Sequence, residues 1–306
     1  METVEGVCGV ARGNEPKVSY RSSFRRCGKP NCSTCGEGPG HGPYWYAQWR
    51  EGNRVRSRYI GLQAPLVETE PAEFRVSTLG RLSIRLTDGS EFLPTGRVRS
   101  LLTLLLASSY GSVGREEIAE SIWPEYDSLS GDQNLRVTIA ALRRQLGSPE
   151  FIRVNGPTVI LLLPTGCRDD FQFEVTARDA LATDDPTKLT EAVERYTGIF
   201  LPDDIYDDWT RYRRQVLLDL FREVTLRAVL RPVGSQTKRM SWLRRLIRDN
   251  RYDEQAVEQL ALLLAAASRR IEALKLLDEF EALVRRELEA DISASLSQLR
   301  QSLASP

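Results

Sequence analysis

The chain has 306 residues, of which 41% are hydrophobic and 27% are charged, and its 42 basic residues balance its 42 acidic residues. This length and composition are sufficient to bury cores in two or three domains. No apolar run reaches membrane-spanning length and no N-terminal signal pattern is present, which argues against a membrane or secreted protein; we expect a cytoplasmic, nucleoid-associated one.

The zero net charge hides an uneven distribution. Residues 1–65 carry ten basic and five acidic residues, a net charge of +5. Residues 66–170 carry eleven and fourteen, and residues 171–306 carry 21 and 23, so these segments have net charges of −3 and −2. If the middle segment binds nucleic acid, the binding must rely on local basic patches, because the segment has no overall positive charge.

Three of the five cysteines lie close to the single histidine, with the spacing Cys27-x4-Cys32-x2-Cys35-x5-His41. Three thiolates and an imidazole in so short a segment suit tetrahedral Zn²⁺, and a cytoplasmic protein favours metal binding over disulfides. We therefore predict a structural zinc site at these four residues, with Cys8 as a substitute ligand. The alternative is a flexible loop that carries free thiols.

A β-hairpin is predicted directly after this cluster. Its strands are residues 43–50 and 54–60, separated by Glu51-Gly52-Asn53. The second strand alternates arginine with other residues, so the same face carries Arg54, Arg56 and Arg58. We expect residues 1–65 to form a small zinc-stapled β module.

The function of this module has two interpretations. The arginine face, together with the basic stretch Arg25–Cys32, resembles the β-sheet arm-binding modules of some recombinases, which implies contact with DNA. Alternatively, the aromatic residues at 44–46 and 49 form a minimal core and the arginines are only solvated. The two interpretations are compatible.

Residues 64–73 are rich in alanine, proline and acids and predict a linker. After it, residues 74–79 and 82–86 have strand character, and Asp88-Gly89 predicts a turn between strands. A leucine-rich helix is expected from Val98 to Ala107.

A helix pair between Arg115 and Leu146 is the most informative feature of the chain. Its second helix repeats apolar residues at helical spacing on one face: Leu135, Ile139, Leu142 and Leu146. No acid occurs between residues 133 and 149, and the other face offers arginine and small side chains. Such a face suits entry into a DNA major groove, although an ordinary amphipathic surface helix has the same pattern.

A second hairpin follows, with strands at residues 151–154 and 158–163 around Asn155-Gly156. Strands, three helices and a closing hairpin predict a winged helix-turn-helix over residues 73–168. The segment resembles the DNA-binding domain of OmpR/PhoB-type regulators, and more closely that of the Streptomyces antibiotic regulatory proteins. The matching residues occur in order at Leu79-Gly80, Leu101-Leu102, Ile122-Trp123-Pro124, Asn134–Val137 and Leu142–Gly147.

The resemblance implies a set of contacts. Positions equivalent to Arg136, Val137 and Ala141 approach base edges in that family. The full predicted DNA-binding set in this domain is Arg136, Val137, Thr138, Ala140, Ala141, Arg143, Arg144, Arg153 and Asn155. The preceding acidic helix, with Glu116, Glu117 and Glu120, corresponds to the part that meets RNA polymerase; alternatively, these acids simply solvate a surface helix.

Residues 171–306 are expected to be all α-helical and tetratricopeptide-like, because apolar residues recur at three- and four-residue spacings. The pattern Tyr196-x-Gly198-x-Phe200-Leu201-Pro202, followed by Tyr206, Trp209 and Arg213, resembles the bacterial transcriptional activator domain. We expect Trp209 and Arg213 to pack against the winged helix. The alternative is a generic helical bundle.

An enzyme is not expected. The single histidine leaves none for a nucleophile–base pair, and no phosphate-binding loop motif is present. Asp203-Asp204 and Asp207-Asp208 resemble a carboxylate cluster but are expected to cap the following helix.

The resulting fold class is α+β and multidomain. The predicted function is a sequence-specific transcription regulator, an activator that recruits RNA polymerase and binds double-stranded DNA as a homodimer on direct repeats. The first alternative is a DNA-binding assembly or targeting protein of a mobile element or defence system. The second is a helical scaffold whose winged helix binds protein.

Overall fold

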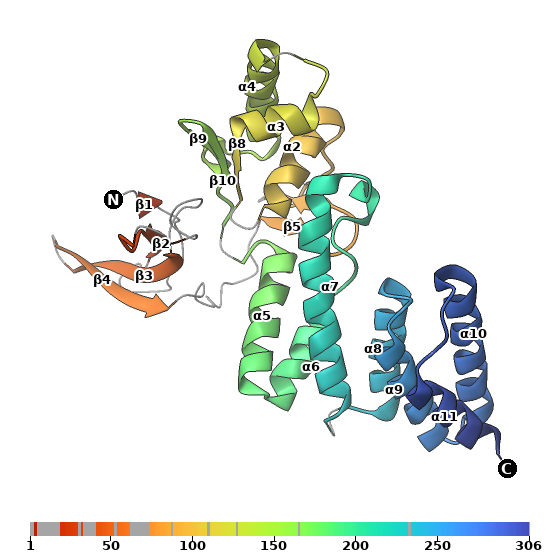
Figure 1. Ribbon diagram of the computed structural model, residues 1–306. Helices are drawn as coiled ribbons and strands as arrows, with labels where there is room; N and C mark the ends of the chain where they lie inside the picture. The colour runs from red at the N-terminus through yellow and green to blue at the C-terminus, as the bar shows by residue number, and fades with distance from the viewer. Residues whose placement is uncertain are drawn as a thin grey trace. The chain divides into compact units, whose positions relative to one another are not determined.

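The computed structural model describes residues 3–4, 19–29, 32, 41–51, 54–61, 74–86, 88–108, 111–126, 128–164, 166–231 and 234–305 (Figure 1). Contacts within the chain define two compact units. The first comprises residues 1–175 and 201–213, and the second comprises residues 176–200 and 214–306. Two helices, α5 (Asp169–Thr183) and α7 (Asp208–Val229), begin in the first unit and end in the second.

The N-terminal sheet is antiparallel with the strand order β1-β2-β3-β4. Its strands are β1 (Thr3–Val4), β2 (Ser19–Arg25), β3 (His41–Glu51) and β4 (Arg54–Gly61). The predicted β3–β4 hairpin is confirmed, with Glu51 paired to Arg54 at its closed end. The ring of Tyr59 lies 6.2 Å from that of Tyr44 and 5.4 Å from that of Tyr46, between centroids. Aromatic contacts therefore support one face of the hairpin.

The winged helix begins with a small antiparallel sheet in the order β5-β6-β7. Its strands are β5 (Arg75–Ser77), β6 (Ser83–Arg85) and β7 (Glu91–Phe92). The predicted turn at Asp88-Gly89 is confirmed, since Gly89 adopts φ +80° and its N–H donates to the Leu86 carbonyl. Both predicted strands are shorter than their sequence patterns.

Three helices follow: α2 (Gly96–Ala107), α3 (Arg115–Ile122) and α4 (Ser128–Gln145). A short 3-10 turn, η1 (Pro149–Phe151), then leads to the wing. Every residue of α2 from Leu101 to Ala107 is buried, and so are Ile118 and Ile122 of α3. The predicted apolar stripe of α4 is also buried and completes this core. The stripe is thus confirmed as the core face, because its spacing places these side chains on one side of the helix.

The wing is the hairpin of β9 (Ile152–Asn155) and β10 (Thr158–Leu161). Asn155 pairs with Thr158, so the connecting residues are Gly156 and Pro157, one position later than predicted. A third strand, β8 (Ser112–Gly114), pairs with β10 and gives the order β8-β10-β9. No strand was predicted at the position of β8.

The second unit is built from helices. Besides parts of α5 and α7 it contains α6 (Pro186–Arg195), α8 (Gln236–Asp249), α9 (Glu254–Ala266), α10 (Arg270–Leu288) and α11 (Ala294–Ala304). Four of these begin with a side-chain cap, from Asp185, Ser235, Asp253 and Ser293. Within the region expected to be helical, the apolar spacing marks individual helices at residues 189–196, 209–230, 240–248, 254–267 and 271–289; α5 and α11 lie outside these ranges.

The core of the second unit contains aromatic residues. Tyr196 stacks on Phe221 with centroids 4.0 Å apart, and Trp242 is buried while its indole N–H donates to Glu194. The predicted fold class is therefore confirmed: small sheets and a winged helix precede an all-helical region. In the part of the chain that the structure describes, none of the helices has both the length and the apolar character needed to span a membrane.

Candidate nucleic-acid interface and metal centre

The position of α4 is set by its close crossing with α3. Gly131 is buried, and a Cβ atom at this position would lie 3.3 Å from the Cβ of Ala119 on α3. A side chain here would make a tight contact that Ala119 could relieve only by shifting a few tenths of an ångström, so glycine permits the close crossing. With the apolar stripe also buried, the opposite face of α4 is left exposed.

This exposed face carries most of the residues predicted to contact DNA. The side chain of Arg136 is 72% exposed and Val137 is 66% exposed. Ala140 and Arg144 are also exposed, and Ala141 is half-buried. The face thus combines two guanidinium groups with small or apolar side chains.

Two predicted contact residues of α4 are engaged within the protein instead. Thr138 is buried, and its hydroxyl donates to the Asn134 carbonyl at 2.8 Å. Arg143 is half-buried, and its Nε and Nη2 atoms donate to the Ile152 carbonyl at 2.9 and 2.7 Å. Arg143 therefore ties α4 to the first strand of the wing.

The wing presents the remaining predicted residues of this domain. Arg153 and Asn155 are exposed on β9, and Val154 between them is 38% exposed. The Pro157 carbonyl at the turn accepts a hydrogen bond from the Arg115 backbone N–H at 2.7 Å. The start of α3 is therefore fixed to the tip of the wing.

The acids of α3 lie on its solvent side. Glu116, Glu117 and Glu120 are exposed, whereas Ile118 and Ile122 of the same helix face the core. In the following turn, Glu125 pairs with Arg97 at 2.9 Å. The three predicted polymerase-facing residues are thus accessible to a partner.

The predicted arginines of the N-terminal module occupy the sheet-edge strand β4. Arg54, Arg56 and Arg58 are exposed, and so are the residues that alternate with them, including Val55 at 62% and Tyr59 at 49%. The Nε atom of Arg56 pairs with Glu51 at 2.8 Å. The strand is accessible from both faces along residues 54–59.

Three of the four predicted metal ligands converge. Ligand atoms of Cys27, Cys32 and His41 all lie within 4.8 Å of one another, and Cys32 Sγ is 3.2 Å from His41 Nε2. A tetrahedral zinc site separates a sulfur from a nitrogen ligand by roughly 3.5 Å, so two thiols and an imidazole at this spacing fit Zn²⁺. Cys35, the fourth predicted ligand, lies outside the described residues.

The sheet brings these ligands together. Arg25 at the end of β2 is the register partner of His41 at the start of β3, and Cys27 follows two residues later. The site therefore joins the ends of two paired strands. Arg25 also donates to the Tyr46 hydroxyl at 2.9 Å.

A buried ion cluster, composed of Arg168, Asp170, Glu174 and Arg213, joins the start of α5 to the start of α7. Asp170 is fully buried and accepts from Arg168 at 2.8 Å and from Arg213 at 2.9 Å. Burial alone would raise the pKa of Asp170, but the two guanidinium groups outweigh it and lower the pKa below 3.8. Arg213 also pairs with Glu174.

Two predictions about the start of α7 have different outcomes. Trp209 does contact the winged helix, since its indole N–H donates to Thr103 of α2 at 3.3 Å. Asp204, one of the residues expected to cap α7, is buried and forms a two-point ion pair with Arg99 at 2.6 and 2.7 Å.

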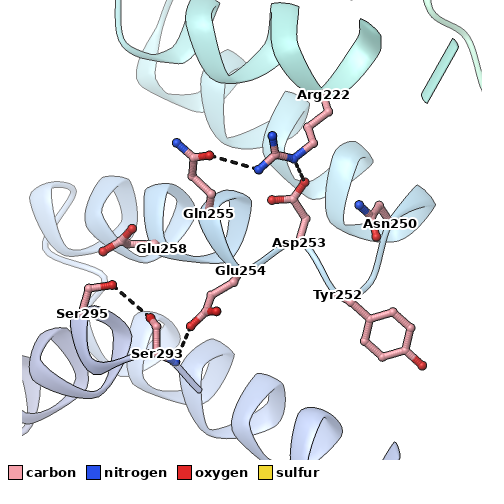
Figure 2. A pocket seen from close by; sticks show the side chains of 9 residues that line it. All are labelled: Arg222, Asn250, Tyr252, Asp253, Glu254, Gln255, Glu258, Ser293 and Ser295. Carbon is pink, nitrogen blue, oxygen red and sulfur yellow. Dashed lines mark hydrogen bonds and ion pairs between the residues drawn. The ribbon is translucent and has the colours of Figure 1, made fainter. Parts of the chain in front are cut away.

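The second unit also contains an open polar pocket of about 400 Å³ (Figure 2). Its polar groups bond to one another: Arg222 donates to Asp253 at 2.6 Å and to Gln255 at 3.0 Å, and Glu254 accepts from the Ser293 N–H at 2.6 Å. Asp253 additionally caps α9. These contacts join α7, α9 and the start of α11.

Comparison with known proteins identifies two regions. Residues 10–69 match a domain of unknown function, DUF6788, and residues 169–304 match the bacterial transcriptional activator domain. No curated protein matches the chain. Among solved structures, the fold is similar to that of Mycobacterium tuberculosis EmbR in complex with a low affinity phosphopeptide, with a TM-score of 0.57 and 19% sequence identity.

That similarity covers 76% of this chain and 65% of the EmbR chain, so the present chain spans just under two thirds of its length. At this identity the likeness establishes a shared fold. The chain therefore carries a bacterial transcriptional activator domain at residues 169–304, an EmbR-like fold, and an N-terminal DUF6788 module.

Proposed function

We propose that this chain is a sequence-specific DNA-binding transcription regulator, and specifically an activator. The observation that carries the proposal is the exposed face of α4, where Arg136 and Arg144 flank Val137 and Ala140. Arginine donates paired hydrogen bonds to guanine, and small apolar side chains contact thymine methyl groups. The activator domain in the same chain favours transcription regulation as the purpose of this binding.

The proposed interface has two parts. The winged helix contributes the exposed face of α4 with Ala141, and it adds Arg153 and Asn155 from the wing. Thr138 and Arg143 are left out because they bond within the fold. The N-terminal module adds the exposed β4 arginines, which supply positive charge that the net-acidic winged helix lacks.

The test begins with a duplex selected by the full-length chain from a random pool. Arg136→Ala should weaken binding to that duplex about tenfold at fixed salt and relax its sequence preference, because one arginine–base contact is lost. Arg285→Ala is the matched control, since Arg285 is similarly exposed (65%) in an i,i+4 ion pair on α10. Equal affinity and preference for Arg136→Ala and the unaltered chain would contradict the proposal.

We further infer that two or more copies bind adjacent direct repeats. A single winged helix buries little DNA surface, and this one has no net positive charge, so linked copies would supply the affinity. Duplexes with one or two repeats distinguish the cases in a titration. Equal affinity for both duplexes would rule out coupled binding.

A charge-reversal experiment on the acidic residues of α3 distinguishes activation from a second candidate function. Reversing the charges of Glu116, Glu117 and Glu120 should abolish transcription but leave DNA binding intact if these exposed side chains contact RNA polymerase. The second candidate is a protein that marks DNA ends for a mobile element or defence system, favoured by the exposed arginine strand of the N-terminal module. Bound sites at element ends rather than promoters would support this candidate.

The converging thiols and imidazole support a structural zinc site at Cys27, Cys32 and His41, completed by Cys35. The module has little apolar surface of its own, so metal binding would contribute to its folding free energy. No step of DNA recognition needs the ion to contact DNA.

A further inference from the structure

One acid at the start of α4 lies between two arginines. Asp132 Oδ2 is 2.7 Å from Nη2 of Arg136, one helical turn later on the same helix, and its Oδ1 accepts from Arg115 of α3. The Asp132 side chain is 32% exposed and that of Arg115 is 26% exposed, whereas Arg136 is 72% exposed. The partly buried pair of Asp132 and Arg115 thus holds the exposed guanidinium of Arg136.

The acid is itself held in place. It follows Gly131, where a Cβ atom would lie 3.3 Å from the Cβ of Ala119 on α3, and its partner Arg115 is bonded through its backbone N–H to Pro157 of the wing. The contact from Arg115, whose own backbone is bonded to the wing turn, therefore limits the movement of the carboxylate.

We infer that Asp132 is a positioning residue for DNA recognition by Arg136, an inference that rests on the proposed function. A guanidinium that is already oriented loses less conformational entropy when it bonds to a base edge. The carboxylate also repels phosphate, so it disfavours the sequence-independent contacts that a free arginine would make. Asp132 therefore raises the ratio of specific to non-specific affinity rather than the total affinity.

The experiment compares Asp132→Asn with the unaltered full-length chain on two probes. One is the duplex selected from a random pool, and the other is a scrambled duplex of equal composition. The affinity ratio between them should fall about tenfold, within the range that one arginine–base contact contributes. Binding of the scrambled duplex should tighten, and its dependence on log salt should steepen by about one unit, because the freed Arg136 pairs with a phosphate.

A double variant tests whether Asp132 acts through Arg136. The double variant with Asp132→Asn and Arg136→Ala should have the same affinity ratio as the Arg136→Ala variant alone. The matched control is Glu281→Gln, because Glu281 likewise lies between an i,i+4 arginine, Arg285 at 3.0 Å, and an arginine of a neighbouring helix, Arg300 at 3.4 Å. This control should leave the ratio and the salt dependence unchanged.

The outcomes are distinguishable. If Arg136→Ala does not alter selectivity, the proposed base contact fails and this inference fails with it. If Arg136→Ala lowers selectivity but Asp132→Asn leaves the ratio and salt dependence unchanged, only the positioning role is overturned. Should Asp132→Asn fail to fold by circular dichroism, Arg115→Gln removes the anchor instead; it should lower the ratio, and an unchanged ratio would overturn the role.

Discussion

Removing the carboxylate of Asp170 should destabilise the first unit far more than removing an exposed carboxylate. The side chains of Asp170, Arg168 and Arg213 are 0%, 8% and 7% exposed. Asp170→Asn leaves two buried guanidinium groups without their shared anion, and breaking a buried pair in this way costs about 3–5 kcal/mol. That is a substantial part of the 5–15 kcal/mol typical of a folded domain, about a fifth or more.

Asp208→Asn provides the matched control. Asp208 pairs with Arg211 at a similar distance, 2.7 Å, but these side chains are 84% and 80% exposed. Exposed pairs contribute at most about 1 kcal/mol. Urea unfolding would give the change in unfolding free energy, and hydrogen exchange in α5 and α7 would locate it. Losses below about 1 kcal/mol for both variants would refute the argument that burial makes this cluster structurally important.

Three further predictions concern pH, metal and packing. The pKa of Asp170 is lowered in the folded state, so the stabilisation by its carboxylate should be complete above about pH 4 and lost as pH falls through that lowered pKa. In urea unfolding, the difference in unfolding free energy between the unaltered chain and Asp170→Asn should therefore shrink as the pH is lowered. Chelation should unfold the N-terminal module alone, and less than about half an equivalent of zinc in protein purified without chelator would count against the site. Leu135→Ala, at a fully buried position, should cost about 2–5 kcal/mol in denaturant unfolding, against roughly 0.5 kcal/mol or less for the exposed Val137→Ala; equal costs would disprove the assigned faces of α4.

Local patterns in the sequence predicted the elements whose residues interact mainly with near neighbours. The stripe from Leu135 to Leu146 predicted both the helix α4 and its buried face, because helical spacing alone places those side chains together. The β3–β4 hairpin and the wing were predictable because short turns connect adjacent strands of alternating residues. The close spacing of Cys27, Cys32 and His41 along the chain likewise indicated that they share a site.

Elements that depend on distant partners were not predictable in this way. β8 has three residues with one buried side chain, Val113, and it exists through pairing with β10 more than forty positions later. α5 lies in the region expected to be helical, but it buries Phe173 together with small alanines, so its apolar pattern is too weak to mark its bounds. For β8, tertiary contacts rather than local preference decide the structure.

The sequence by itself determined which face of α4 is apolar and which face carries polar and small side chains, since both follow from the periodicity of one helix. Only the tertiary structure decided how those polar residues are used. It buries Thr138, bonds Arg143 to the wing, and selects Asp132 as the partner of Arg136 and Arg115. A chain with 42 acids and 42 bases allows many ion pairs, and the choice among them depends on distances that exist only after the helices and the wing have packed.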